Sequence, residues 1–156
     1  QLGISSIFDM GEVPWKWYLE YADTAVYKNK FNIAYEHHIY RTGYRYNKKA
    51  IGSTYDNDST AFVFGIMGRL SSDSSVSIKL SNLKINRDSK NLFAIDTHTL
   101  SSQLRTFNRL NIEWQQHFMK QGTLKLNVDY FSDGFDDYGR QKNKYRIGVD
   151  WEYPIY

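Results

Sequence analysis

The sequence has no cysteine, only two prolines, and no apolar run that approaches the length of a membrane-spanning helix. The lack of cysteine excludes a disulfide framework and a thiolate metal site. A transmembrane helix needs about 20 consecutive apolar residues, so the short runs exclude one. The net charge of +3 is too small to argue for a nucleic-acid partner. Residues 1–8 also lack the basic and apolar regions of a signal peptide, so an exported chain would already have lost its leader.

What the sequence does contain is an alternation of apolar and polar residues, which is clearest at residues 143–156. Six apolar side chains share one parity there: Tyr145, Ile147, Val149, Trp151, Tyr153 and Ile155. A period of two predicts a strand with one apolar face, and this one has about the ten residues that a tilted membrane strand needs. Low mean hydropathy does not exclude a membrane barrel, since half of each barrel strand faces a polar lumen.

The same alternation predicts further strands along the chain. They lie at 15–26, 31–40, 60–70, 75–86, 103–119 and 124–130, with a weaker strand at 1–8 and a loop at 9–14. Within 75–86 the apolar parity shifts between Leu80 and Leu83, which predicts a β-bulge. The connections alternate in length, with short ones near residues 28, 72 and 121 and long ones at 41–59, 87–102 and 132–142.

Up-and-down outer-membrane barrels alternate short periplasmic turns with longer extracellular loops in this way. We therefore predict an all-β fold: an antiparallel up-and-down transmembrane β-barrel, or the C-terminal part of one, with seven to eight strands in residues 1–156. The long loops would be extracellular and the C-terminus periplasmic, in a bacterial outer membrane. Charges of both signs, such as Arg109 and Asp129, fall on the polar parity and predict ion pairs or hydration in the lumen.

Three segments of the sequence form a further pattern: EYADT at 20–24, YEHHIY at 35–40 followed by TGYRY at 42–46, and IG at 51–52 leading to DNDS at 56–59. In order and spacing these segments resemble the capsule-assembly family of outer-membrane β-barrels, the Wzi type. Separately, residues 146–153 resemble the C-terminal insertion signal of such barrels. The family resemblance implies a non-enzymatic, lectin-like barrel that helps attach and organise capsular polysaccharide at the cell surface. It also implies a larger barrel with upstream strands and periplasmic helices, of which residues 1–156 are the C-terminal part.

The loop at 41–59 holds the residues that we predict to contact polysaccharide. They are Arg41, Tyr44, Arg45, Tyr46, Lys48 and Lys49. Aromatic rings can stack on the apolar faces of sugars, while Arg and Lys pair with the anionic groups of acidic polysaccharides. Outer-membrane lipid and lipopolysaccharide are the other expected partners, and no cofactor is expected.

No catalytic or metal site is predicted from the remaining polar residues. The carboxylates Glu20, Glu36 and Glu113 show no spacing that defines a glycosidase pair. Adjacent strand residues point to opposite faces, so His37-His38 cannot chelate one ion. The segment 56–58 lacks the glycine and distal glutamate of a calcium loop, which favours an ordinary solvated turn.

Two alternatives remain open from the sequence. One is a complete eight-stranded outer-membrane barrel that acts as a porin or as an envelope enzyme. The other is a soluble β-barrel or sandwich that binds a ligand, in which the apolar faces would pack inside.

Overall fold

A computed structural model describes residues 1–11, 13–25, 45–46, 49–50, 53–89, 103–119, 121–133 and 144–153 of the chain. Their regular structure consists of β-strands. The strands are β1 (Leu2–Met10), β2 (Val13–Asp23), β3 (Arg45–Tyr46), β4 (Lys49–Ala50), β5 (Thr60–Arg69), β6 (Ser74–Ile85), β7 (Arg105–Phe118), β8 (Gly122–Phe131) and β9 (Tyr145–Glu152). No helix in this described part is long and apolar enough to cross a bilayer.

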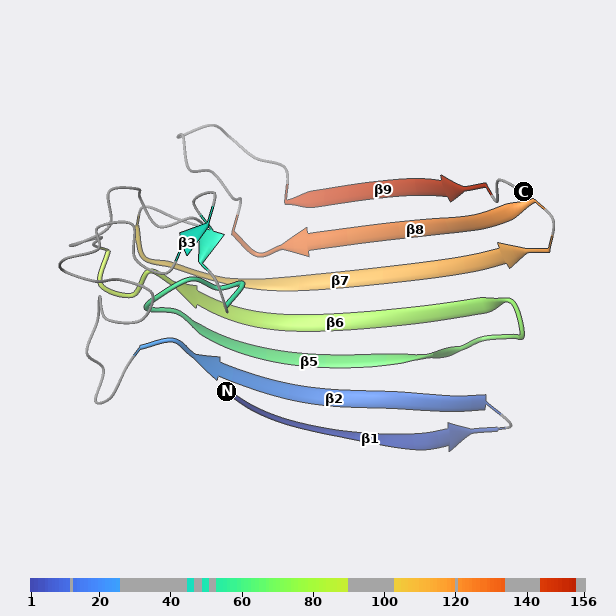
Figure 1. The fold of residues 1–156 in the computed structure, drawn as a ribbon, viewed down its shortest axis with the longest axis horizontal. Helices are drawn as coiled ribbons and strands as arrows, with labels where there is room; N and C mark the ends of the chain where they lie inside the picture. The colour runs from blue at the N-terminus through green and yellow to red at the C-terminus, as the bar shows by residue number, and fades with distance from the viewer. Residues whose placement is uncertain are drawn as a thin grey trace.

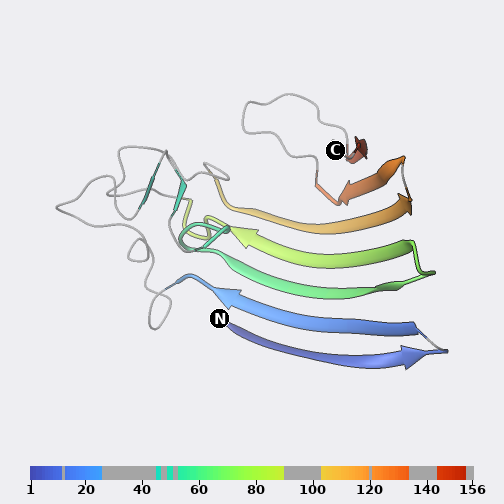
Figure 2. The same ribbon diagram turned by 45° about the vertical axis from the view of Figure 1, so that its right-hand side comes forward.

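Seven strands form one antiparallel sheet in the order β1-β2-β5-β6-β7-β8-β9, and β3 pairs with β4 in a separate hairpin. Each strand of the large sheet pairs with the next one along the chain, which is up-and-down topology. The sheet is strongly curved (Figures 1 and 2). Among the described residues β1 pairs only with β2 and β9 only with β8, so the sheet is open at both edges. The predicted all-β, up-and-down class is confirmed, as a barrel wall that does not close on itself.

The connections divide the sheet into two ends. Short turns join β1 to β2, β5 to β6 and β7 to β8 at one end, called here the turn end. Long connections leave β2, β6 and β8 at the opposite end, called the loop end, where Figure 1 also shows the β3–β4 hairpin. The short connections predicted near residues 72 and 121 are therefore confirmed, as are long connections before β5, after β6 and after β8, and β9 runs toward the turn end.

Two details of the predicted strand arrangement are wrong, one in the order of the strands and one in where a loop lies. First, β2 pairs directly with β5, so no strand from residues 31–40 lies between them in the sheet. Residues 31–40 and the turn predicted near residue 28 are themselves outside the described residues. Second, the loop predicted at 9–14 is the tip of the β1–β2 hairpin, where Met10 pairs with Val13. Gly11 adopts φ of 71° there, because a two-residue hairpin turn needs positive φ.

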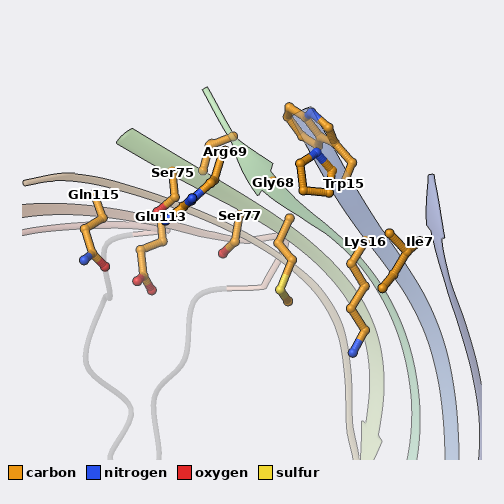
Figure 3. Close-up of a pocket in the computed structure, with 12 residues that line it drawn as sticks. Ile7, Trp15, Lys16, Gly68, Arg69, Ser75, Ser77, Glu113 and Gln115 are labelled. Atoms are coloured by element: carbon orange, nitrogen blue, oxygen red, sulfur yellow. The ribbon is translucent and has the colours of Figure 1, made fainter. Parts of the chain in front are cut away.

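The two faces of the curved sheet differ in chemistry. The convex face carries a central row of registered apolar residues: Trp17, Ile66, Ile78, Ile112, Val128 and Ile147. Figure 3 shows Trp15 on this side of the sheet, with Lys16, Ser77 and Glu113 on the concave side. In this row Val128 and Ile147 are 37% and 73% exposed, and the other four side chains are half-buried. Monomeric soluble proteins rarely expose a contiguous apolar surface of this kind.

The bulge predicted within β6 is wrong. β6 pairs without interruption with β5 from Ser75 to Lys84 and with β7 from Ser74 to Ile85. The parity shift has another cause, because Leu83 and Ile85 lie on the concave face, where they are buried. They belong to the small hydrophobic core of the described residues, at the loop end. Its members are Ala61, Leu83, Ile85 and Phe107, with Ala22, Tyr55 and Phe131 packed against them.

Candidate functional site

The β3–β4 hairpin contains part of the predicted polysaccharide-binding loop. Arg45 pairs with Ala50, and Tyr46 pairs with Lys49, so these loop residues lie together on one short hairpin. The Tyr46 side chain is 72% exposed, as a stacking ring for a sugar must be. The other three predicted residues lie outside the described part of the chain. They are Arg41, Tyr44 and Lys48.

The turn at 56–59 connects this loop to β5, and it is buried. Its residues are at most 1% exposed, so the prediction of a solvated turn is wrong. The Thr24 and Ser59 backbones are tied together, since Thr24 N donates to Ser59 O and Ser59 N donates to Thr24 Oγ1, both at 2.9 Å. The amide of Arg87 donates to Asp58 O at 3.0 Å. The turn therefore fastens the end of β2 to the end of β6.

Asp residues suit this turn for conformational reasons. Asp56 and Asp58 have φ of 59° and 48°, in the left-handed region that Asp and Asn tolerate better than most side chains. The Asp56 carboxylate also accepts the Asn57 backbone N–H at 2.9 Å, and the Asn57 side-chain amide donates to Asp58 at 3.2 Å. These local hydrogen bonds assign the motif a structural role, which is to fix the chain between Tyr55 and β5 beside the hydrophobic core.

A polar network continues from this core along the concave face. Arg109 on β7 contacts Asp129 on β8 through Nε at 2.8 Å and Nη2 at 2.7 Å. The Asn111 side-chain amide donates to the same Asp129 oxygen at 3.1 Å and to Asn127 at 3.2 Å. Asp129 is buried, so its charge depends on these donors. The pairing of charges that the sequence predicted on the polar parity is thus realised here between neighbouring strands.

Aromatic side chains lie beside this network, and sequence reasoning did not single them out as a site. The Tyr18 ring on β2 lies over Gly65, where any Cβ would overlap it. Tyr55 projects from the turn before β5. Burial raises the pKa of the Tyr55 phenol, and the negative charge of Glu20 raises it further, while Arg109 lowers it. Tyr55 therefore lies near charges from both β2 and β7.

We call Tyr18, Glu20, Tyr55 and Arg109 the concave patch. Tyrosine faces, a carboxylate and a guanidinium are groups that can stack on a sugar and hydrogen-bond its hydroxyls. One feature of the sequence could have indicated this patch, namely the aromatic Tyr18 on the otherwise polar parity of β2. Nothing in the sequence pattern placed Tyr55 near it, because Tyr55 lies outside the large sheet, where it packs against the hydrophobic core.

A separate recess of about 350 Å³ lies at the turn end. Figure 3 shows Lys16, Ser77, Glu113 and Gln115 extending into the hollow of the sheet from three strands. Ile7 on β1 lines it as well. The recess is remote from the long loops, and its mixed charges do not define a reaction or a ligand class.

Metal ligands do not gather within the described ranges. No group of three or more His, Cys, Asp or Glu side chains among these residues is placed to hold an ion. His37, His38 and Glu36 lie outside the described part. The carboxylates at 56–58 serve the turn hydrogen bonds given above.

Comparison with models of protein families shows to which family the chain belongs. The family model described as capsule assembly protein Wzi matches residues 1–145, which is most of the sequence. The chain belongs to the Wzi capsule assembly family. No curated protein matches the sequence. The segments that resembled this family in the sequence all lie within the matched residues.

A solved structure shares the fold of this Wzi-family chain. It is described as Wzi, an outer-membrane protein involved in group 1 capsule assembly in Escherichia coli and a carbohydrate-binding β-barrel. The two chains are 21% identical and superpose with a TM-score of 0.72. The match covers 83% of this chain and 28% of that chain. At this identity the likeness establishes the fold, and the seven-stranded sheet corresponds to one sector of a larger barrel wall.

Proposed function

We propose that this Wzi-family chain is a sector of a bacterial outer-membrane barrel, with its convex face in lipid. The exposed apolar band on the convex face supports this placement, and the charged, hydrogen-bonded concave face supports a wet lumen. A soluble barrel would require the opposite arrangement, with apolar residues inside. An open sheet in lipid would leave backbone groups unpaired at β1 and β9, so further strands would have to cover both edges.

The orientation follows from the two ends of the sheet. The long connections at the loop end are assigned to the cell exterior, and the short turns to the periplasm, as in other outer-membrane barrels. Since β9 runs toward the turn end, its C-terminal end is assigned to the periplasmic side. Lipid and lipopolysaccharide would then contact the convex face.

Within this barrel, the chain would help attach and organise capsular polysaccharide through its long loops. The contact residues are those predicted from the sequence: Arg41, Tyr44, Arg45, Tyr46, Lys48 and Lys49. The exposed Tyr46 in the β3–β4 hairpin is the single structural observation that carries this assignment. The concave patch, on the loop-end half of the sheet, would extend the same surface into the lumen. The carbohydrate-binding description of the solved Wzi structure is consistent with this role.

The proposed role is binding without catalysis. Two carboxylates on the concave face already have structural partners, since Asp129 pairs with Arg109 and Glu152 pairs with Lys125. A carboxylate that is committed to an ion pair is not placed to transfer a proton to a substrate.

The test replaces Arg41, Arg45, Lys48 and Lys49 together by Gln in the full-length protein, in capsulated cells. We expect capsule to be released into the medium, because the anion-binding groups are lost while the side-chain length is nearly kept. Insertion of the barrel, read from the mobility shift of unboiled protein on gels, should not change. Capsule retention equal to the wild type would reject the role of the loop.

A smaller matched comparison removes the effect of net charge. The Arg45→Gln/Lys49→Gln variant and the Lys16→Gln/Arg69→Gln variant each lose one arginine and one lysine. The first pair lies at the loop end and the second at the turn end. Release of capsule by the first variant alone supports the loop, whereas equal release by both would show a general charge effect.

A further inference from the structure

The convex face carries a groove of about 420 Å³ that the proposed polysaccharide role does not use. Its walls include Phe62 and Phe64 from β5 on one side and Tyr130 from β8 on the other, with Leu80 and Leu110 between them. All five belong to two adjacent rows on the loop-end side of the central apolar row. The groove therefore lies near the level at which the apolar band ends.

The groove exists because short polar side chains interrupt an aromatic row. In register with Phe62, β6 and β7 carry Asn82 and Asn108, which are much smaller than the rings beside them. Asn82 Nδ2 donates to Asn108 Oδ1 at 2.7 Å. Within the described residues this leaves Asn82 Oδ1 as an acceptor and Asn108 Nδ2 as a donor without side-chain partners. The apolar groove thus ends at a pair of amides.

One row further toward the loops, the convex face carries a cation. Lys84 is exposed and in register with Thr60 and Thr106, and it forms no ion pair with the residues that the structure describes. The carboxylate in the same row, Asp23, is already held by Arg87 at 2.9 Å. Along β6 toward the loop end, the convex surface therefore changes in three steps. Aromatic and aliphatic side chains around Leu80 come first, the amide pair at Asn82 follows, and the ammonium group of Lys84 comes last.

We infer that this groove binds one phosphate-bearing lipid of the outer leaflet. An acyl chain fills the apolar groove, its carbonyl or hydroxyl groups meet the Asn82–Asn108 pair, and a headgroup phosphate pairs with Lys84. Charge complementarity favours a lipid over a neutral partner, since only an anionic amphiphile matches all three zones in this order. The inference rests on the proposed membrane placement with the loops outside, and it adds a defined lipid site to it.

The experiment is native mass spectrometry of the full-length protein in detergent, titrated with lipid A that retains its phosphates. We expect one tightly held lipid per protein. Lys84→Gln should weaken it about fivefold, the effect of removing one lysine near an anionic headgroup. Leu80→Trp, which fills the groove without changing charge, should remove the bound lipid.

Two matched controls lie on the same strand. Lys79→Gln removes a lysine from the concave face of β6, and Ile78→Trp adds a ring on the convex face outside the groove. Neither should change lipid binding. Dephosphorylated lipid A should bind the wild type about as weakly as phosphorylated lipid A binds Lys84→Gln.

Three results would overturn the site. Equal binding by the wild type, Lys84→Gln and Leu80→Trp would mean non-specific lipid around the barrel. Complete competition by inorganic phosphate with no effect of Leu80→Trp would mean a simple anion site. Equal weakening by the control variants would mean a general loss of structure. The proposed function fails separately, if the protein does not insert into membranes or if capsule retention is independent of the loop.

Discussion

Arginine at Ile78 should destabilise the folded protein far more than arginine at Ser77, although the two residues are adjacent on β6. Ile78 lies in the middle of the central convex row, between Ile66 and Ile112. Ser77 lies at nearly the same depth on the concave face and is in register with Glu113. The two substitutions therefore differ mainly in the face of the sheet that receives the charge.

The structure sets the expected magnitudes. On the lipid face of an outer-membrane barrel, an arginine near the bilayer midplane costs about 2–4 kcal/mol. That cost lowers the ratio of folded to unfolded protein by about 30- to 1,000-fold. On the wet concave face, arginine opposite Glu113 should change the stability by no more than about 0.5 kcal/mol.

The assay is urea-dependent folding of the full-length protein into phosphatidylcholine vesicles, followed by tryptophan fluorescence and by mobility on unboiled gels. Ile78→Arg should move the unfolding midpoint strongly to lower urea, and Ser77→Arg should leave it nearly unchanged. Equal destabilisation, or a larger effect at Ser77, would refute the assignment of the convex face to lipid, and the membrane placement would be lost with it.

Three further outcomes follow from the concave face. Arg109→Ala should lower the free energy of unfolding in urea by about 2–3 kcal/mol, because it leaves the buried Asp129 charge without its cation. Asp129→Asn in the same chain should recover part of this loss, and additive losses in the double variant would contradict the pairing. Gly65→Ala should cost about 1–3 kcal/mol through overlap with the Tyr18 ring, and a Tyr18→Ala background should remove that cost. Because burial and a nearby carboxylate raise the pKa of Tyr55 above its usual 10.0, its contribution to stability is fully present below pH 10 and is lost as the pH rises further. Tyr55→Phe should flatten this decline in unfolding curves measured from about pH 9 to about pH 11, and an unchanged decline would place the tyrosine in solvent.

Strand positions could be predicted because the alternation is a local property of the chain. The apolar parity of residues 145–151 predicted a strand with one apolar face, and the register places Tyr145, Ile147, Val149 and Trp151 in line with the apolar parity of β8. Family membership was likewise predicted from short segments and is confirmed by the match over residues 1–145. The polysaccharide-binding role of residues 41–49 stays a prediction.

Where the prediction was wrong, a contact between distant residues replaced a local rule. The parity shift at Leu83 is typical of a bulge when one strand is considered alone. In the folded sheet, β6 pairs without a bulge. Leu83 and Ile85 lie on its concave face and are buried there, because Phe107 and Ala61 complete a hydrophobic core. Residues 56–59 are polar enough for solvent, yet they are buried, because their backbone groups find partners at Thr24 and Arg87.

The sequence by itself determined the β class, the two chemically distinct faces and the alternation of short turns with long loops. These depend on the period of two in side-chain direction and on turn composition, which neighbouring residues express without help from the rest of the chain. Only the tertiary structure decided that β2 pairs with β5, that Tyr55 lies near the charges of Glu20 and Arg109, and that a groove forms beside Asn82 and Asn108. Each of these results from pairing and packing between residues far apart in sequence, for which the local alternation carries no information.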